Sequence, residues 1–226
     1  MGTDVTDLAG CARDSQFPAR RPRRFRRARS GPDRRRALPL LKGGAHVTAT
    51  EADHAFVEAC LAEFDSPRVA LVQTPQYYAN WTRGGIAEAS WAQQSLFFGT
   101  IAQGRDALGA MFCCGTNVIF RRTALVEAGG FPEDSVTEDF ELSVRLHSAG
   151  WRSVYVPEVL VQGLGPEDAA SYVSQQLRWS RGCISAIPRV LRARLPLGVR
   201  LQYLLSASYF LYGWTLVVYM LMPLLR

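Results

Sequence analysis

The chain has 226 residues, of which 48% are hydrophobic, and a formal net charge of +6. This length allows one domain with a substantial core and excludes two large domains unless one is incomplete. Its five cysteines are an odd number and form no CxxC pair, which argues against a disulfide framework and a zinc site and favours a reducing, cytosolic setting.

Residues 1–38 form a segment rich in proline and arginine without apolar periodicity. Much of the positive charge lies in ARRPRRFRRARSGPDRRR, residues 19–36. Such a composition cannot bury enough apolar surface to offset the entropy of ordering it, so we predict a disordered tail. An alternative is binding of anionic lipid or nucleic acid, the latter disfavoured because no aromatic platform or groove-reading helix accompanies the arginines.

Helices alternate with short apolar strands in the middle of the chain. In chain order we expect a helix over residues 50–64 with Thr50 as N-cap, a buried strand over 68–74, a long helix over 85–108, a turn and strand over 112–122, a short helix over 123–131, a helix over 135–150 and a strand over 151–158. This alternation predicts an α/β domain built on a mainly parallel sheet.

The C-terminal part has the composition of a membrane-associated segment. Residues 167–195 predict amphipathic helices, kinked or split at Pro188, whose arginines and aliphatic residues suit a membrane interface. Residues 201–225 carry no charge and are long enough to cross a hydrocarbon layer of roughly 30 Å, which predicts a transmembrane helix. Because arginines crowd the N-terminal side of this stretch, we expect the α/β domain on the cytosolic side of the membrane.

The stretch DSVTEDFELSVRLHSAGW, residues 134–151, combines a helix start with candidate site residues. Helix capping explains part of it: Ser135 would cap the helix, Glu138 would reach back, and Gly150 would end it. Capping leaves Asp139 unexplained except as a charge near the positive helix end. A carboxylate held rigidly at the start of a buried helix is a candidate general base.

A second candidate motif is QQLRW, residues 175–179, which places Gln175, Arg178 and Trp179 on one helix face. Arginine pairs with phosphate, an amide orients hydroxyls or phosphate oxygens, and an indole stacks on a sugar ring. The alternative is an interfacial helix with ordinary Arg and Trp anchors.

Taken in order, four motifs followed by a predicted membrane span resemble the membrane-embedded family 2 glycosyltransferases typified by bacterial cellulose synthase. The motifs are QTPQYY (73–78), FCCGTN (112–117), TED (137–139) and QQLRW (175–179). The resemblance implies a cytosolic GT-A domain, a nucleotide-binding α/β sandwich, attached to membrane helices that form a polysaccharide channel. It also implies a location at the inner (plasma) membrane.

The resemblance further implies a role for each motif residue. Asp139, supported by Glu138 and Thr137, would deprotonate the acceptor hydroxyl for inverting attack on a UDP-sugar. The implied substrate-binding residues are Gln175 and Arg178 near the diphosphate, Trp179 under the acceptor sugar, Cys114, Gly115 and Thr116 in the acceptor-binding turn, and Gln73 and Gln76 of QTPQ.

The metal site is the main departure from the family pattern, in which a DxD motif holds Mg²⁺ or Mn²⁺. In the corresponding place this chain has Glu51-Ala52-Asp53-His54, so Asp53 is the candidate metal ligand. No apolar strand precedes it, and a helix start explains the same residues. The segment LLKGGAH, residues 40–46, is similar to the family's KAGN segment, which implies that the block with the metal motif is absent.

We therefore expect a partial GT-A domain that lacks the donor-binding half. Its expected parts are a disordered tail (1–38), the partial GT-A domain (39–165), interface helices with QxxRW (166–198) and a transmembrane helix (201–225). The expected function is transfer of a hexose, from UDP-glucose, to a growing β-linked polysaccharide, alongside other subunits of a polysaccharide synthase. Two alternatives are a catalytically inactive membrane-associated fragment and a basic-tailed protein that binds nucleic acid or anionic lipid.

Overall fold

The computed structural model of the chain describes residues 54–133, 135–211 and 221–222. These residues belong to one unit of the chain, residues 46–226. The predicted tail, the N-cap Thr50 and the candidate metal ligand Asp53 lie outside the described residues.

Strand β1 (Val69–Gln73) is the centre of a three-stranded sheet with the order β3-β1-β4. It pairs in parallel with β4 (Arg152–Tyr155) and antiparallel with β3 (Val118–Phe120). All of β1 is buried, which explains why VALVQ is apolar without alternation. A second ribbon joins β2 (Tyr77–Tyr78) in parallel to β5 (Gln162–Gly163), so parallel pairing predominates, as predicted.

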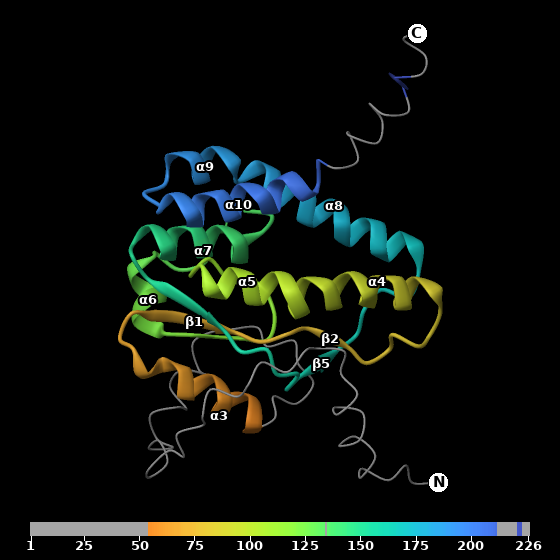
Figure 1. Cartoon of the computed structure of the whole chain (residues 1–226), viewed down its shortest axis with the longest axis horizontal. Helices are drawn as coiled ribbons and strands as arrows, with labels where there is room; N and C mark the ends of the chain where they lie inside the picture. Colours follow the sequence, from red (N-terminus) through yellow and green to blue (C-terminus); the bar gives the residue numbers. More distant parts are fainter. Residues whose placement is uncertain (1–53, 134, 212–220, 223–226) are drawn as a thin grey trace. The chain divides into compact units, whose positions relative to one another are not determined.

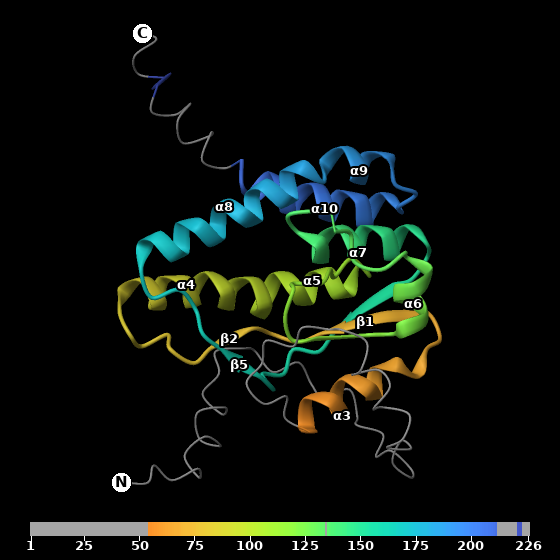
Figure 2. The same cartoon turned by 180° about the vertical axis from the view of Figure 1, so that it is seen from behind.

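The helices form layers on both sides of this sheet (Figures 1 and 2). In chain order they are α3 (His54–Ala62), η2 (Glu63–Asp65), α4 (Gly85–Leu96), the π-helical turn η3 (Phe97–Ile101), α5 (Ala102–Ala107), α6 (Arg122–Glu127), α7 (Glu138–Ser148), α8 (Ala169–Ser185), α9 (Ile187–Arg192) and α10 (Leu197–Tyr209). Helix α3 lies on one side of the sheet, and α4, α5 and α7 lie on the other. Helices α8, α9 and α10 form a further layer beyond α7.

Two predictions about the helices are confirmed. The predicted helix over residues 85–108 is continuous from α4 through η3 to α5. The predicted break near Pro188 is also confirmed, because α8 ends at Ser185 and Pro188 lies in the first turn of α9, where its missing N–H has no helical partner to lose.

Helix α10 contains the start of the predicted membrane span. Among the described residues, no helix is both long and apolar enough to cross a membrane. Residues 212–220 and 223–226 of the predicted span lie outside the described part of the chain. The predicted start of the span at residue 201 falls within α10, where Tyr203 and Ala207 are buried against the domain. In addition, Arg105 Nη2 donates hydrogen bonds to the Gln202 carbonyl (3.0 Å) and to Ser206 Oγ (2.6 Å).

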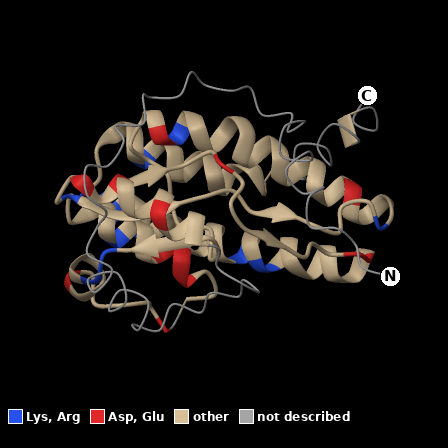
Figure 3. Cartoon of the chain, turned by 90° about the horizontal axis from the view of Figure 1, so that it is seen from below, with Lys and Arg blue, Asp and Glu red and all other residues tan. Residues whose placement is uncertain are grey.

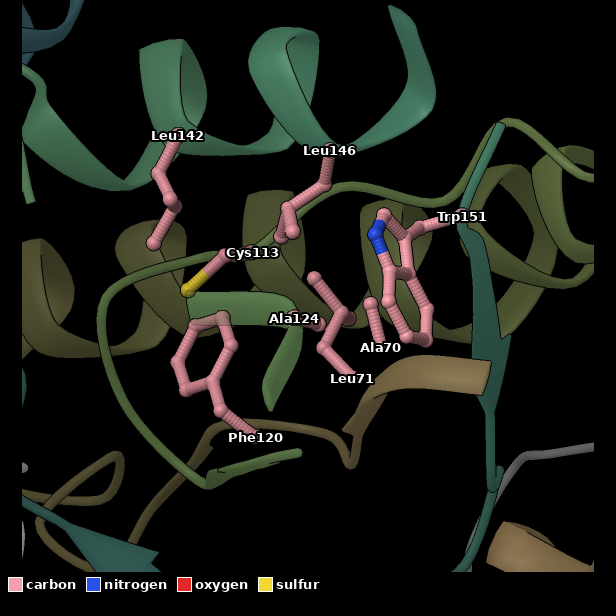
Figure 4. Close-up of a cluster of buried hydrophobic side chains, with 8 residues drawn as sticks. All are labelled: Ala70, Leu71, Cys113, Phe120, Ala124, Leu142, Leu146 and Trp151. Carbon is pink, nitrogen blue, oxygen red and sulfur yellow. The ribbon is translucent and has the colours of Figure 1, made fainter. Parts of the chain in front are cut away.

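Helix α7 is buried on two faces. Figure 4 shows Leu142 and Leu146 pointing from α7 towards Leu71 of β1, in a cluster closed by Ala70, Cys113, Phe120, Ala124 and Trp151. On its other face, Phe140 and Val144 join a second cluster with residues of α9 and α10. The i, i+4 spacing of each pair places its two side chains on one face of the helix. The sheet and the outer helices therefore both fix α7.

Replacing Leu142 with alanine tests whether this burial holds α7. The Leu142 side chain is fully buried, so we expect Leu142→Ala to lower the free energy of unfolding by about 2–5 kcal/mol in urea titrations. Val126→Ala on α6 is the control, because Val126 is 71% exposed and the expected change is within about 0.5 kcal/mol. Similar effects of the two substitutions would contradict the assigned packing.

Candidate functional site

Three of the predicted motifs meet at the N-terminal end of α7. Gly115 of the FCCGTN turn approaches Asp139 so closely that a Cβ at Gly115 would lie 3.0 Å from Asp139 Oδ2. Gly115 also has a φ of +79°, a conformation that favours glycine. On the other side, Gly182 of α8 packs directly against the Thr137 side chain. The structure thus brings together the turn, the TED triplet and the helix that carries QQLRW.

The start of α7 differs from the predicted capping box. The helix begins at Glu138, so the N-cap is Thr137, and no side chain forms a capping hydrogen bond there. Because Glu138 is the first helical residue instead of the third, it cannot reach back as the capping box requires. Glu138 is exposed, whereas Thr137 is buried under Gly182. The predicted stop is confirmed, since Gly150 follows the helix with a φ of +81°.

Ser143 connects the FCCGTN turn to the carboxylate-bearing end of α7. The Cys113 N–H donates to Ser143 Oγ (2.8 Å), and Ser143 Oγ donates to the Asp139 carbonyl (2.8 Å). Ser143 is completely buried. The sequence pattern does not single out this residue, which lies one turn after Asp139 among alternating polar and apolar residues. The turn and the Asp139 backbone are therefore held at a fixed spacing.

Gln73, at the end of β1, holds the same turn from the sheet side. Its Nε2 donates to the Thr116 carbonyl (2.7 Å), and its Oε1 accepts from the Cys114 N–H (2.9 Å). Asn117, at a φ of +53°, adds a bond from Nδ2 to the Pro75 carbonyl (2.8 Å). The Gln73 side chain is completely buried, so its place is behind the turn, and only the half-buried Gln76 of the predicted QTPQ pair reaches the surface.

The environment of Asp139 makes its carboxylate more basic than usual. The pKa of Asp139 is raised from 3.8 to about 6, chiefly by burial, and the charge of Glu138 acts in the same direction. The Phe140 N–H, which donates to Asp139 Oδ1 at 2.7 Å, and the charge of Arg178 lower the pKa. An aspartate with a pKa near 6 is mostly ionised at neutral pH and still able to accept a proton, as a general base must be.

The thiols around Asp139 are not activated. Burial raises the pKa of Cys183 to about 12, and it raises the pKa of Cys113 and of Cys114 well above the usual range. The nearby Asp139 charge acts in the same direction on all three. Since the thiolate is the nucleophilic form of cysteine, these three thiols provide no activated nucleophile beside Asp139.

In the described part of the chain, six buried side-chain atoms have no hydrogen-bond partner: three nitrogens of Arg105 and Arg200, and three oxygens on these motifs. Among the described residues, the buried oxygens Thr116 Oγ1, Thr137 Oγ1 and Gln175 Oε1 have no hydrogen-bond partner. Buried polar groups in folded proteins are nearly always paired, so unpaired ones mark strain or a place where a ligand completes the bonding. Each of these oxygens belongs to a different motif: the FCCGTN turn, the TED triplet and QQLRW.

Helix α8 presents QQLRW beside this site. Asp168 caps the helix by accepting from the Ser171 N–H at 2.9 Å. Arg178 is exposed, and Gln175 and Trp179 are half-buried. The Arg178 guanidinium is exposed and close enough to Asp139 to lower its pKa. It is therefore available to bind a negatively charged ligand beside that carboxylate.

The predicted metal site has no support among the described residues. Asp53 lies outside them, and within them no group of three or more His, Cys, Asp or Glu side chains could hold a metal ion. His54 is the first residue of α3, where its Nδ1 lies 3.2 Å from Glu58 Oε1 one turn later, and both side chains are exposed. Both residues belong to the first turns of α3, as expected where a helix starts.

The chain is similar to known proteins over most of its length. Residues 50–226 match the protein-family model described as "Glycosyl transferase family group 2". The chain is 33% identical over 194 residues to the cellulose synthase 1 catalytic subunit (UDP-forming) of Komagataeibacter xylinus, covering 80% of this chain and 26% of that protein. It is 32% identical over 186 residues to the cellulose synthase catalytic subunit (UDP-forming) of Xanthomonas axonopodis pv. citri, covering 75% and 25%.

The chain thus spans about a quarter of the length of these curated relatives. Among solved structures, it is similar to a mannosyltransferase from Pyrobaculum calidifontis in complex with GDP-Man and Mn²⁺. That likeness has a TM-score of 0.49 at 16% identity and covers 82% of this chain and 55% of the other.

Substitution of Gln73 tests the anchoring of the turn. Gln73→Ala leaves the Cys114 N–H and the Thr116 carbonyl without their bonds to the strand, so we expect the free energy of unfolding to fall by about 2–4 kcal/mol in urea titrations. Gln76→Ala is the matched control, with an expected loss of less than about 0.5 kcal/mol. A loss at Gln73 no larger than at Gln76 would refute the anchoring role.

The pKa of Asp139 has a consequence for stability. Because the folded-state pKa is raised, the folded chain binds more protons than the unfolded chain between about pH 4 and pH 6, and this group's contribution to stability falls as the pH rises through that window. Asp139→Asn should therefore increase the free energy of unfolding at pH 8 by about 1–3 kcal/mol, and the gain should fade towards pH 4.

Urea titrations at both pH values measure this difference. The exposed Asp65→Asn serves as control, with an expected change below about 0.5 kcal/mol. A loss of stability at pH 8 for Asp139→Asn would show that the carboxylate charge is stabilised in the fold.

Proposed function

We propose that the chain, which belongs to glycosyl transferase family group 2, transfers a hexose from a nucleotide sugar to a growing β-linked polysaccharide with inversion. The observation that carries the proposal is the meeting of Asp139, whose pKa is raised to about 6, with the Gly115 turn and the Arg178 helix. Because the relatives are named as UDP-forming cellulose synthase subunits, UDP-glucose is the proposed donor and a β-glucan the proposed acceptor.

In the proposed reaction, Asp139 removes the proton from an acceptor hydroxyl. The acceptor oxygen then forms a bond to the anomeric carbon from the side opposite the diphosphate, and the bond between that carbon and the diphosphate oxygen breaks. The bonding electrons leave with the nucleoside diphosphate, the proton stays on Asp139, and the sugar inverts. Arg178 offers a cation to the leaving diphosphate, supported by Gln175.

The FCCGTN turn is the proposed binding site of the acceptor sugar. Gly115 has no side chain to separate an incoming hydroxyl from Asp139 Oδ2. Thr116 carries an unpaired oxygen, Cys114 borders the same turn, and Trp179 provides an aromatic face of the kind on which sugars stack. Glu138 and Thr137 border the base. Gln73 acts through the turn, which it anchors, and Gln76 is the partly accessible member of that pair.

We also propose that α8 to α10 face a membrane. Large apolar side chains are exposed along these helices, namely Val173, Leu177, Ile184, Leu191, Leu197, Leu201, Leu205 and Tyr209. Exposed arginines, including Arg181, Arg192 and Arg194, accompany them, as suits an interface with anionic lipid. This supports a location on the cytosolic side of the inner membrane, with residues beyond α10 contributing the membrane-embedded part and other synthase subunits as partners.

Two predicted features remain proposals without support from the described residues. Mg²⁺ or Mn²⁺ has no ligand set there, so no step above depends on a metal. The nucleic-acid alternative rests on residues 19–36, which lie outside the described residues. Seen from below in Figure 3, acidic and basic residues are interspersed over the described elements, whereas a nucleic-acid surface needs clustered cations.

The test uses the full chain in lipid nanodiscs, with UDP-[¹⁴C]glucose as donor and a cello-oligosaccharide as acceptor. We expect transfer that Asp139→Asn reduces at least about 100-fold, while UDP binding measured by calorimetry stays within about twofold of wild type. Asp65→Asn, which lies on η2, should transfer normally.

Loss of UDP binding in Asp139→Asn would contradict the role of Asp139 as base. UDP binding without transfer by the wild-type chain would favour the alternative of a catalytically inactive membrane-associated fragment.

A further inference from the structure

Gly182 is a glycine inside a helix whose conformation does not require one. It lies in α8, four residues after Arg178 and three after Trp179, so it shares their side of the helix. Its φ is not positive, and glycine inside a helix costs roughly 0.5–1 kcal/mol relative to alanine. The reason for a glycine must therefore lie in what surrounds it.

The surroundings of Gly182 leave no room for a side chain. A Cβ at this position would lie 2.6 Å from Thr137 Cβ and would overlap Thr137 Cγ2 and Oγ1. The contrast with other glycines in helices is sharp, because Gly104 in α5 and Gly198 in α10 have nothing within 4 Å of the same point. The backbone of α8 at Gly182 is thus in direct contact with the Thr137 side chain of the TED triplet.

Thr137 is the residue of the TED triplet that Gly182 of α8 contacts. It is only 7% exposed, and its hydroxyl has no hydrogen-bond partner among the described residues. It is the N-cap of α7 and lies two residues before Asp139, but it forms no capping hydrogen bond. Its contact with Gly182 is therefore steric, and it joins the two helices beside the proposed base.

From this packing we infer that Gly182 is a positioning residue of the proposed reaction: its missing side chain lets α8 seat on Thr137, which sets the distance between the QQLRW segment and Asp139. The inference rests on the proposed function for its catalytic meaning, and the contact itself is independent of it. No side chain of Gly182 touches substrate. It acts through Arg178 and Trp179, whose helix it allows to come close.

The charge environment of Asp139 provides a readout for this distance. Arg178 on α8 lowers the pKa of Asp139, whereas burial and Glu138 on α7 raise it. The other titratable groups near Asp139 are the thiols of Cys113 and Cys114 on the turn and of Cys183 on α8, all uncharged at neutral pH. Moving α8 outward weakens the attraction of Arg178, but it also admits water to the carboxylate. Burial is the largest influence on this group, so the pKa of Asp139 falls towards its ordinary value.

The experiment compares Gly182→Ala with wild type by ¹³C NMR titration of the Asp139 carboxyl group in the full chain. We expect the midpoint to fall by about 0.5 pH unit or more and the transfer rate at saturating donor to fall at least about tenfold. The double variant Gly182→Ala/Thr137→Gly removes the overlapping atoms and should return the midpoint to within about 0.2 unit of wild type. The control Gly104→Ala should leave midpoint and rate unchanged.

An unchanged midpoint in Gly182→Ala, or a double variant without recovery, would overturn the inference. If Gly182→Ala does not fold, the double variant decides: a folded chain with the wild-type midpoint supports the inference, and an unfolded one contradicts it. A chain that transfers no sugar would refute the proposed function, while the titration would still test the packing of Gly182 on Thr137.

Discussion

The burial of α7 between two hydrophobic clusters is the constraint on which the rest of the site depends. Leu142 and Leu146 bind the helix to the sheet, and Phe140 and Val144 bind it to α9 and α10. A helix held on both faces cannot tilt or rotate without opening one of the clusters. Its first turn, with Asp139, is fixed in consequence, and the same burial removes water from the carboxylate and raises its pKa.

Polar contacts then place the FCCGTN turn on this fixed helix. Gln73 and Ser143 use buried side-chain atoms to bond the backbone of the turn, from the strand and from α7 respectively. Each such bond contributes only about 1 kcal/mol net, but leaving either backbone group unpaired in the interior would cost more. The turn therefore has one satisfactory position, although it has no regular secondary structure of its own.

Features of the structure that depend on neighbouring residues were predicted from the sequence, whereas features that depend on residues far away in the chain were not. Strand β1 and the break at Pro188 follow from composition and backbone chemistry within a few residues, and both were predicted. The roles of Gln73 and Ser143 depend on partners 30 to 43 residues away, which no local pattern specifies. The predicted capping box is absent: the helix begins at Glu138, and its N-cap Thr137 packs against Gly182, 45 residues further along the chain. Hydropathy alone could not show that Tyr203 and Ala207 face protein.

The cysteines near Asp139 acquire a different meaning from the same loss of water. Oxidation of cysteine to sulfenic acid proceeds through the thiolate, and burial keeps Cys113, Cys114 and Cys183 protonated. A single physical cause thus gives opposite chemical results on two kinds of side chain. It makes the carboxylate a better proton acceptor and keeps the sulfur atoms beside it in the thiol form, which reacts with oxidants more slowly than the thiolate. Three thiols can therefore lie beside the proposed base without being activated by it.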